Sequence, residues 1–323
     1  MPVPGPGQVR IRVAACALNH LDLWVRKGLP GLRRPYPFIL GSDVAGTIDA
    51  LGAGMSGVAE GDEVLINPGL SCGRCRACLS GHDNLCRDYG ILGEHSDGGY
   101  AEFLVVPAAN LLPAPQRLTP VERATFPVTF LTAWQMLVHK VALRPGETVL
   151  IHAAGSGVGV AALQIAKVLG AEVIATASSE AKLARARELG ADHTLLSGEG
   201  LLEGIRRITG KQGVDVVVEH TGAATWSTSI LACARGGRIV TCGATSGYEA
   251  ITDLRHVFYR QIAIFGSTMG SKGDLFPLLD HIAAGRLRPV IDCVLPLAAA
   301  RQAHERLENR AQFGKIVLTL SLT

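Results

Sequence analysis

The sequence has few aromatic residues, few charged residues and no long hydrophobic run, and each shortage excludes a class of protein. Aromatic residues make up 5% and charged residues 18% of the 323 positions. The net charge of +3 is too small to indicate binding to nucleic acid or to an anionic membrane surface. No apolar run reaches the roughly 18 residues needed to cross a bilayer. The first seven residues also lack the basic and apolar stretches of a secretion signal, so we expect a cytoplasmic protein.

The chain is long enough, and apolar enough, for two folded domains. Hydrophobic residues make up 48% of the sequence, which excludes a disordered protein. Residues 1–120 read as short strands and glycine-rich turns, for example the alternating segment 8–17, which indicates a compact β-barrel-like domain. No internal repeat or low-complexity linker separates this part from the rest.

From residue 121 onward, helical patterns alternate with apolar strands. Segments 148–153, 171–177, 214–219 and 237–242 read as buried strands, with helices between them, and this alternation predicts a doubly wound parallel sheet. The sheet is complete by about residue 266, so the tail is expected to return to the first domain. We place one domain at residues 1–124 and 267–323, and the other at residues 125–266.

Four of the eight cysteines lie in one short loop, residues 71–87. Clustered cysteines in a long chain without a secretion signal more often bind metal than form disulfides. Four thiolates satisfy tetrahedral zinc completely, so a single structural zinc is expected, with Arg74, Arg76 and Arg87 partly offsetting the charge. An iron–sulfur cluster and unliganded thiols are the alternatives. The four expected ligands are Cys72, Cys75, Cys78 and Cys86.

A glycine-rich turn follows the strand that ends at Ala153 and precedes a helix. It departs from the strict G-x-G-x-x-G pattern, but its place between strand and helix is the one that pyrophosphate binding requires. Backbone amides at a helix N-terminus can face a dinucleotide pyrophosphate there. A tight turn without a ligand is the alternative. The residues expected at the cofactor are Gly155, Ser156, Gly157, Val158 and Gly159.

The end of the next strand favours NADP over NAD. An NAD site normally has an acidic residue there, whereas this chain has Ala177, Ser178, Ser179 and, one turn on, Lys182. Two hydroxyl groups and an ammonium group can bind a 2′-phosphate, and no carboxylate repels it. The alternative is that a serine only caps the following helix, which is compatible with NAD as well.

The order of these parts resembles the medium-chain dehydrogenase/reductase superfamily, the group of zinc alcohol dehydrogenases and quinone oxidoreductases. The resemblance covers essentially the whole chain, and its most specific pieces are the cysteine loop, Asp97–Glu102 and the turn Ala153–Gly159. It implies an α/β protein with a GroES-like β-barrel domain, a Rossmann domain, a cleft between them and hydride transfer with a nicotinamide. The family's leading strand before the Pro-Gly-x-Val segment is missing, which predicts a truncated or alternative start and an unpaired strand edge.

The chain departs from the family's pattern at the catalytic zinc. The three ligand positions hold Asn19, Ser42 and Val128, which are poor zinc ligands or none, so we expect no catalytic zinc. Loose metal binding by Asp43 with His20 is the alternative. The emptied site resembles the quinone oxidoreductase branch, whereas the cysteine loop resembles the alcohol dehydrogenase branch.

The resemblance also suggests roles for residues near the cofactor. It places Thr132 and the loop of Gly243 and Ala244 beside the nicotinamide, and Lys315 near the pyrophosphate. Ordinary helix, turn and surface roles are the alternatives for these four residues.

Without a metal, a developing oxyanion must be met by hydrogen-bond donors. Asn19 and Ser42 are the expected donors, and His20 or water is the expected source of the proton. A contact with a cofactor phosphate or simple packing are the alternatives for His20.

These residues favour an NAD(P)H-dependent reductase of a small uncharged carbonyl compound, enone or quinone. A conjugated substrate tolerates weaker polarisation, because hydride addition gives a delocalised enolate. The alternatives are an alcohol or aldehyde dehydrogenase of the zinc-containing family and a non-catalytic NADPH-binding sensor. We expect a homodimer or homotetramer, with a small molecule as substrate.

Overall fold

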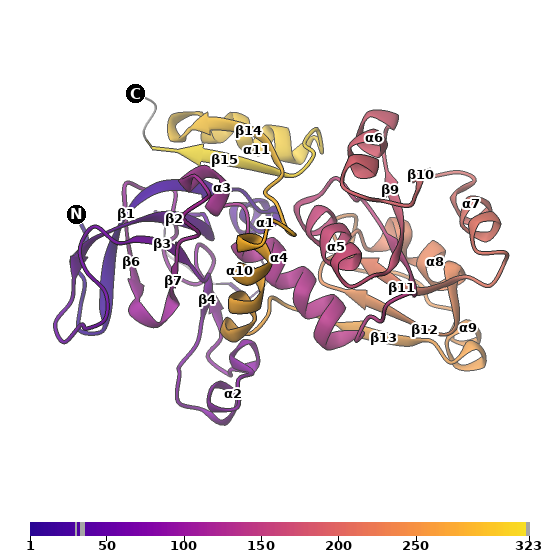
Figure 1. The fold of residues 1–323 in the computed structure, drawn as a ribbon, viewed down its shortest axis with the longest axis horizontal. Coiled ribbons are helices and arrows are strands. Elements are labelled where there is room, and N and C mark those ends of the chain that lie inside the picture. The colour runs from indigo at the N-terminus through magenta and orange to yellow at the C-terminus, as the bar shows by residue number, and fades with distance from the viewer. Residues whose placement is uncertain (30, 33–35, 321–323) are drawn as a thin grey trace. The chain divides into compact units, whose positions relative to one another are not determined.

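A computed structural model describes residues 1–29, 31–32 and 36–320, and the chain forms two compact units. The first consists of Met1–Leu131 and Gly270–Thr323, and the second of Thr132–Met269. The tail therefore rejoins the first unit, as the yellow elements of Figure 1 show. None of the helices in the described part of the chain is both long enough and apolar enough to cross a membrane.

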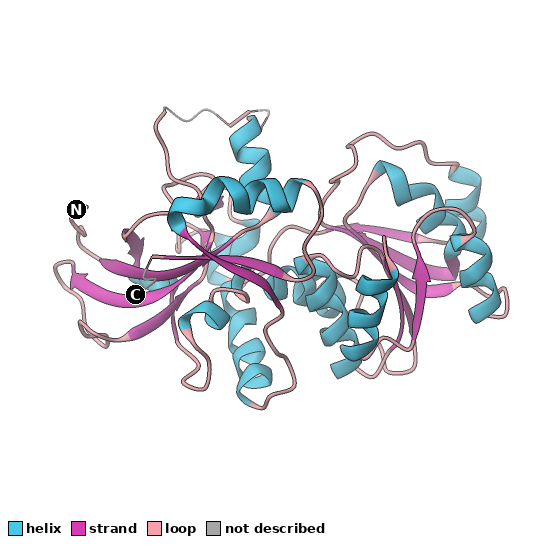
Figure 2. Cartoon of the chain, turned by 90° about the horizontal axis from the view of Figure 1, so that it is seen from above, coloured by secondary structure: helices cyan, strands magenta, loops and turns pink. Residues whose placement is uncertain are grey.

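The first unit is built on a seven-stranded, mostly antiparallel sheet (Figures 1 and 2). The order is β14-β15-β1-β2-β3-β7, and β6 also pairs with β1. Its larger strands are β1 (Gln8–Ala17), β2 (Asp43–Leu51), β3 (Glu63–Ile66), β6 (Phe103–Pro107), β7 (Leu111–Pro113), β14 (Ile291–Pro296) and β15 (Lys315–Thr319). A small second sheet pairs β4 (Gly69–Leu70) with β5 (Gly90–Ile91).

Short helices connect these strands. They are α1 (His20–Lys27), α2 (Arg76–Leu79), η1 (Asp83–Leu85), η2 (Ala108–Asn110), α3 (Pro120–Arg123), α4 (Pro127–Trp134), η4 (Lys272–Asp274), α10 (Leu275–Ala283), η5 (Leu297–Ala299) and α11 (Ala300–Glu308). Helix α4 begins in the first unit and ends in the second.

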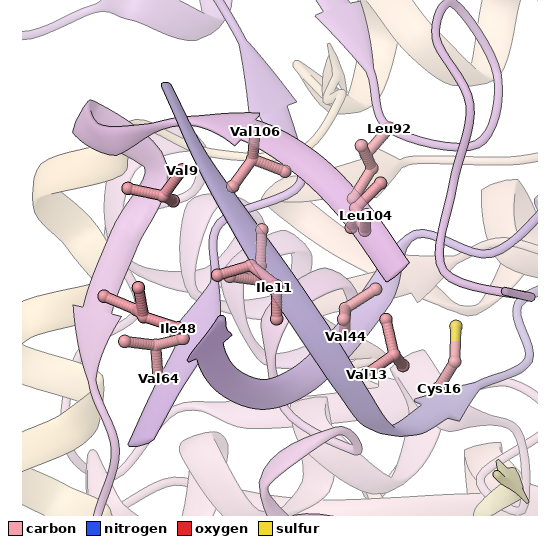
Figure 3. Close-up of a cluster of buried hydrophobic side chains, with 11 residues drawn as sticks. Val9, Ile11, Val13, Cys16, Val44, Ile48, Val64, Leu92, Leu104 and Val106 are labelled. Carbon is pink, nitrogen blue, oxygen red and sulfur yellow. The ribbon is translucent and has the colours of Figure 1, made fainter. Parts of the chain in front are cut away.

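Alternating apolar residues of β1 form the centre of the core in the first unit. Val9, Ile11 and Val13 are buried together with Val44 and Leu104 from the neighbouring strands (Figure 3). This is the period of two that a half-buried strand requires, and it fixes which side of β1 faces the core.

The second unit contains a six-stranded, fully parallel sheet in the order β10-β9-β8-β11-β12-β13. This is the order of dinucleotide-binding folds, in which ligands bind where the order reverses, here between β8 and β11. The strands are β8 (Thr148–Ile151), β9 (Glu172–Ala177), β10 (His193–Leu196), β11 (Val214–Glu219), β12 (Cys233–Thr241) and β13 (Ala263–Gly266). The helices are η3 (Gln135–Lys140, π-helical), α5 (Gly157–Val168), α6 (Glu180–Glu188), α7 (Leu201–Ile208), α8 (Ala223–Ala232) and α9 (Leu254–Arg260).

The segments 39–48 and 98–106 form strands only in their later parts, because their glycine-rich beginnings bind each other instead of extending the sheet. Strand β2 begins only at Asp43, since Gly41 has a φ of +101°. The amide of Gly99 donates to the carbonyl of Gly41, and β6 accordingly begins at Phe103. These contacts place the segment before Asp43 at the sheet end where the candidate catalytic residues gather.

Candidate functional site

The four clustered cysteines form a site for a tetrahedral metal. Their Sγ atoms all lie within 4.8 Å of one another. Cys75 Sγ is 3.5 Å from Cys78 Sγ and 3.7 Å from Cys86 Sγ, and Cys72 Sγ is 3.9 Å from Cys78 Sγ. A zinc ion with Zn–S bonds of about 2.3 Å places its sulfur ligands about 3.8 Å apart. The donor set therefore fits zinc with no open coordination position.

The backbone of the loop turns tightly around the site and favours ionisation of two of the four thiols, those of Cys72 and Cys75. Gly73 and Gly81 have φ values of +70° and +77°, which let the chain turn back on itself around the site. The amides of Arg74 and then Cys75 donate to the Cys72 thiol and lower its pKa to about 6. A thiol that ionises readily is a better metal ligand.

We predict that Cys75→Ser removes the metal and destabilises the first unit. A three-thiolate site binds zinc more weakly, and the loop has little apolar burial of its own to replace the lost cross-link. Purified wild-type protein should contain one zinc per chain by elemental analysis, and the variant much less, with a melting temperature lowered by several degrees. Cys242→Ser is the control outside the loop. An unchanged melting temperature in Cys75→Ser would contradict a structural metal here.

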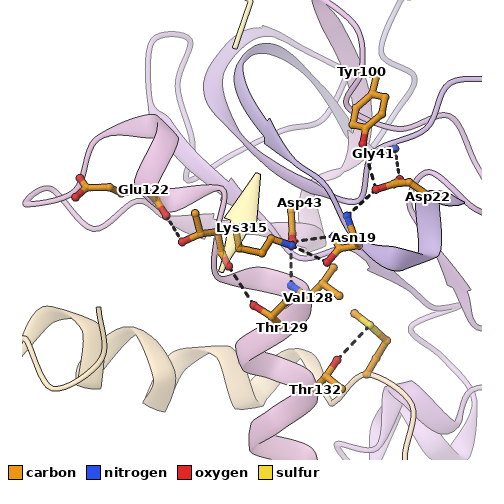
Figure 4. Close-up of polar contacts among 12 residues, drawn as sticks. Asn19, Asp22, Gly41, Asp43, Tyr100, Glu122, Val128, Thr129, Thr132 and Lys315 are labelled. Carbon is orange, nitrogen blue, oxygen red and sulfur yellow. Dashed lines mark hydrogen bonds and ion pairs between the residues drawn. The ribbon is translucent and has the colours of Figure 1, made fainter. Parts of the chain in front are cut away.

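A buried polar network lies at one end of the large sheet (Figure 4). Lys315 Nζ donates to Asn19 Oδ1 at 2.6 Å and to Asp43 Oδ2 at 2.8 Å. Asn19 Nδ2 donates to the same carboxylate oxygen at 2.9 Å, and the Val128 amide donates to Asp43 Oδ1 at 2.7 Å. The side chains of Lys315 and Asp43 are 5% and 0% exposed, so the pair forms a buried, charge-balanced unit.

Sheet register brings these distant residues together. Asp43 lies opposite Ala17 in the β1–β2 pair, and Ala17 also lies opposite Val317 of β15. Asn19 follows two residues later, at the start of α1. Of the expected site residues, Asn19 and Lys315 are therefore in contact with each other in the structure, and both contact Asp43.

Ser42 is fully buried, and its hydroxyl group has no hydrogen-bond partner among the described residues. A buried hydroxyl without a partner is costly, so the atom has capacity for a ligand. His20, by contrast, lies beside the Trp24 ring, with centroids 5.0 Å apart. Partial burial, with Arg310 and Lys27 nearby, lowers the pKa of His20 and favours its neutral form. Thr132 Oγ1 lies 3.8 Å from the sulfur of Met269.

Asp22 ties together the two segments that carry Asn19 and Ser42. Its carboxylate accepts from the amides of Asn19 and Gly41, at 2.7 Å and 3.1 Å, and from the Tyr100 hydroxyl at 3.1 Å (Figure 4). Burial raises the pKa of Asp22 to about 6, although these donors act in the opposite direction. Asp22 therefore sets the geometry of the site without carrying one of its expected roles.

We predict that Asp22 makes the stability of the protein depend on pH between about 4 and 6. An acid whose pKa rises on folding, here from 3.8 to about 6, stabilises the fold fully below pH 3.8 and loses that contribution as the pH rises through 6. Relative to Asp22→Asn, the wild type should lose roughly 2.4 kcal/mol of unfolding free energy between pH 4 and pH 7. Urea denaturation at several pH values measures this, and a difference independent of pH would contradict it.

The glycine-rich turn of the second unit lies at the carboxyl end of β8. Ser156 Oγ accepts from the Gly159 amide at 2.9 Å and so caps α5. A Cβ at Gly159 would lie 2.5 Å from the carbonyl oxygen of Ala153, so only glycine allows the helix to start this close to the strand. Ser156 Oγ also lies 2.8 Å from His220 Nε2, which joins this turn to the one after β11. Gly155, Gly157 and Val158 belong to the same turn and to the first turn of α5.

The other expected cofactor residues lie at the carboxyl ends of neighbouring strands. Ser179 Oγ accepts from the Lys182 amide at 3.4 Å and caps α6, while Ser178 is exposed directly after β9. Gly243 and Ala244 follow β12, where the Thr241 hydroxyl donates to the Gly243 carbonyl. These positions share the edge of the sheet at which parallel sheets bind nucleotides.

Glu219 and His220, which follow the apolar residues of β11, were not expected at the cofactor site. The Glu219 carboxylate accepts from the amides of Thr221 and Gly222 and from the hydroxyl of Ser229. Burial acts to raise the pKa of Glu219, but His152 and these donors outweigh it and lower the pKa. Their position in the sequence could have indicated this. Glu219 and His220 are polar and come directly after the apolar residues of a buried strand, β11, and β11 lies next to β8 where the strand order reverses.

Comparison with known proteins identifies the family. Residues 5–116 match the alcohol dehydrogenase GroES-like domain, and residues 157–284 match the zinc-binding dehydrogenase domain. An NAD-dependent alcohol dehydrogenase of Saccharolobus solfataricus is 33% identical, over 98% of this chain and 94% of its own length. The quinone oxidoreductase of Sus scrofa is 30% identical, over 99% and 91%. A crystal structure of an NAD-dependent alcohol dehydrogenase is 56% identical, with a TM-score of 0.97, over 99% and 94%.

The chain therefore belongs to the medium-chain dehydrogenase/reductase superfamily. It is an NAD(P)-dependent oxidoreductase, and its two units are the GroES-like and Rossmann domains of that family.

Proposed function

We propose that the protein is an NADPH-dependent reductase of small uncharged carbonyl compounds, enones or quinones, and that it works without a catalytic zinc. The observation that carries this proposal is the donor set around Asp43. Asn19, Ser42 and Val128 offer one amide, one hydroxyl and no ligand atom, respectively, in the three positions that the family resemblance compares with catalytic zinc ligands. Such a set does not fit zinc.

The buried ion pair strengthens this argument. Asp43 accepts a hydrogen bond from the side-chain amide of Asn19, and its charge is already balanced by Lys315 Nζ at 2.8 Å. A divalent cation beside them would lie next to an ammonium group in a site with little water, where like charges repel strongly. The residues present are suited instead to binding a polarised oxygen through hydrogen bonds.

The chain's own residues supply binding and polarisation. NADPH, when bound, supplies the hydride. The turn Gly155–Gly159 would hold its pyrophosphate, with Gly243 and Ala244 along the nicotinamide and Thr132 beside it. The Ser42 hydroxyl, which has no partner in the part of the chain that the structure describes, and the second N–H of the Asn19 amide would stabilise negative charge on the substrate oxygen. Because His20 is shifted towards its neutral form, the proton would come from water or from a transiently charged His20.

A second candidate function is alcohol oxidation with NAD. The 56% identical crystal structure, named an NAD-dependent alcohol dehydrogenase, favours it. The two candidates differ in metal content and in substrate, so one set of measurements separates them. A non-catalytic sensor is not supported, because the similar proteins are named as enzymes.

We predict that protein with one zinc per chain oxidises NADPH in the presence of quinones or enones. Turnover with these substrates should exceed alcohol-dependent reduction of NADP or NAD, and Ser42→Ala should lower kcat/KM by about tenfold to a hundredfold. The control is Ser56→Ala, an exposed serine of the same unit. Two zinc ions per chain together with efficient alcohol oxidation would contradict the proposal and support the second candidate.

For the cofactor, we predict that Lys182→Ala weakens NADPH binding and hardly changes NADH binding. A lost ion pair to the 2′-phosphate should raise the Kd for NADPH about tenfold or more. Fluorescence titration with both nucleotides measures this, and Arg207→Ala removes an exposed positive charge elsewhere in the same unit as a control. Equal losses for both nucleotides would show that Lys182 does not select NADP.

We also propose a homodimer formed through β13, which lies at one edge of the parallel sheet. Ile264 of β13 is exposed, and so are Phe258 and Tyr259 of the adjoining α9. An open strand edge flanked by apolar residues can pair with its own copy around a twofold axis.

The eight unpaired cysteines of the chain are consistent with a cytoplasmic location.

The dimer predicts that Ile264→Lys yields a monomer by light scattering coupled to gel filtration. Leu196→Lys, at the exposed position of the opposite edge strand β10, should remain a dimer. A wild-type monomer, or dissociation by the β10 variant alone, would contradict this assignment. A wild-type tetramer that Ile264→Lys converts to dimers would support the β13 contact within a larger assembly.

A further inference from the structure

The segment by which the chain re-enters the first unit binds directly to the cysteine loop. Ser271 Oγ lies 2.6 Å from the Gly81 carbonyl oxygen and 2.7 Å from Asp83 Oδ1. The amide of Lys272 donates to the same Asp83 oxygen at 2.9 Å. Asp83 is only 7% exposed and belongs to η1, three residues before the metal ligand Cys86. We define Gly270–Asp274 as the return segment.

Lys272 fastens the return segment to the base of the loop as well. Its Nζ donates to Asn110 Oδ1 at 3.0 Å, and Asn110 Nδ2 donates to the carbonyl oxygens of Asn67 and Gly69 at 2.7 Å each. Gly69 begins β4, from which the loop departs. Lys272 is also close enough to Asp83, Cys78 and Cys86 for their charges to act on its ammonium group. The return segment therefore contacts the loop at Gly81 and Asp83 and, through Asn110, the backbone at Asn67 and Gly69 from which the loop departs.

The loop cannot keep Asp83 in place through its own secondary structure. Helix α2 has four residues, η1 has three, and β4 and β5 have two each, which is too short for independent stability. No residue of α2 is buried. A metal that cross-links Cys72, Cys75, Cys78 and Cys86 would fix the loop, and with it the position of Asp83.

We propose that Asp83 couples the metal in the cysteine loop to the return segment, so that metal binding and ordering of the return segment stabilise each other. Asp83 is thus a positioning residue whose carboxylate transmits the state of the loop to a segment nearly 190 residues away in the sequence. Linkage requires the effect to act in both directions. A change that loosens the return segment must lower the affinity of the loop for the metal, and loss of the metal must loosen the return segment. This inference does not depend on the substrate or cofactor proposed above.

The first test changes the loop and measures the return segment. Hydrogen exchange of the peptide spanning residues 271–283 is followed in zinc-loaded wild type, metal-free wild type and zinc-loaded Asp83→Ala. We expect exchange to rise about tenfold or more in the last two, because hydrogen bonds to a buried carboxylate are lost. Asp88→Ala, which changes an exposed aspartate directly after the loop, should leave the exchange unchanged, as should peptides of the second unit.

The second test changes the return segment and measures the metal. Ser271→Ala removes one hydroxyl group and leaves every loop residue intact. Its zinc affinity, measured by competition with a chelator, should fall about threefold to tenfold. Gly273→Ala, where a Cβ meets no atom within 4 Å, should bind zinc like the wild type.

Coupling requires both effects. Unchanged exchange at 271–283 on metal loss, or unchanged zinc affinity in Ser271→Ala, would overturn the proposal. The second test remains decisive even if Asp83→Ala does not fold, and neither result depends on measurements of activity.

Discussion

The buried polar network of the first unit is centred on one ion pair, Lys315 with Asp43. Breaking such a pair leaves an uncompensated buried charge, which costs several kcal/mol, so both residues must be positioned by something rigid. The register of β1 with β2 and with β15 does this, since both pairings converge at Ala17. The pair in turn orients the Asn19 amide, whose oxygen accepts from Lys315 and whose nitrogen donates to Asp43. Strand β15, which carries Lys315, thereby determines the orientation of the Asn19 side chain, almost 300 residues earlier in the sequence.

The same ion pair explains why the residues at the three altered ligand positions favour the proposed reaction. Asn19, Ser42 and Val128 supply neither a thiol nor an imidazole, and the nearby ammonium group of Lys315 is already neutralised by Asp43. The remaining groups are hydrogen-bond donors. Such donors can stabilise the spread-out negative charge of an enolate, but they are weaker than a Lewis acid at stabilising the concentrated charge of an isolated alkoxide. The alternative of alcohol oxidation therefore requires a cation that these residues do not favour, even though the overall fold is shared with enzymes named alcohol dehydrogenases.

Sequence patterns predicted those features that local residues determine. The GroES-like and Rossmann folds are confirmed, because strand alternation and the strand–turn–helix around Ser156 are local signals. The cysteine cluster is equally local, since its ligands lie in one loop. The contact between Asn19 and Lys315 could not be predicted, because it joins opposite ends of the chain through sheet register. Helix α1 was not among the predicted elements: it has only eight residues, and one of the three that are buried is the charged Asp22. The assigned roles of individual site residues remain predictions.

The cysteine loop and the residues around Asp43 differ for a physical reason: the four thiols of the loop suit a metal, whereas the three positions compared with zinc ligands hold Asn19, Ser42 and Val128. The loop has almost no core: Leu79 and Leu85 are exposed, and its helices are shorter than two turns. A metal cross-link is the available way to give such a segment one conformation. The residues around Asp43 lie at the ends of long paired strands, which already have one conformation. There a lysine can supply the positive charge that a metal would supply, because the sheet, rather than coordination bonds, provides the positioning.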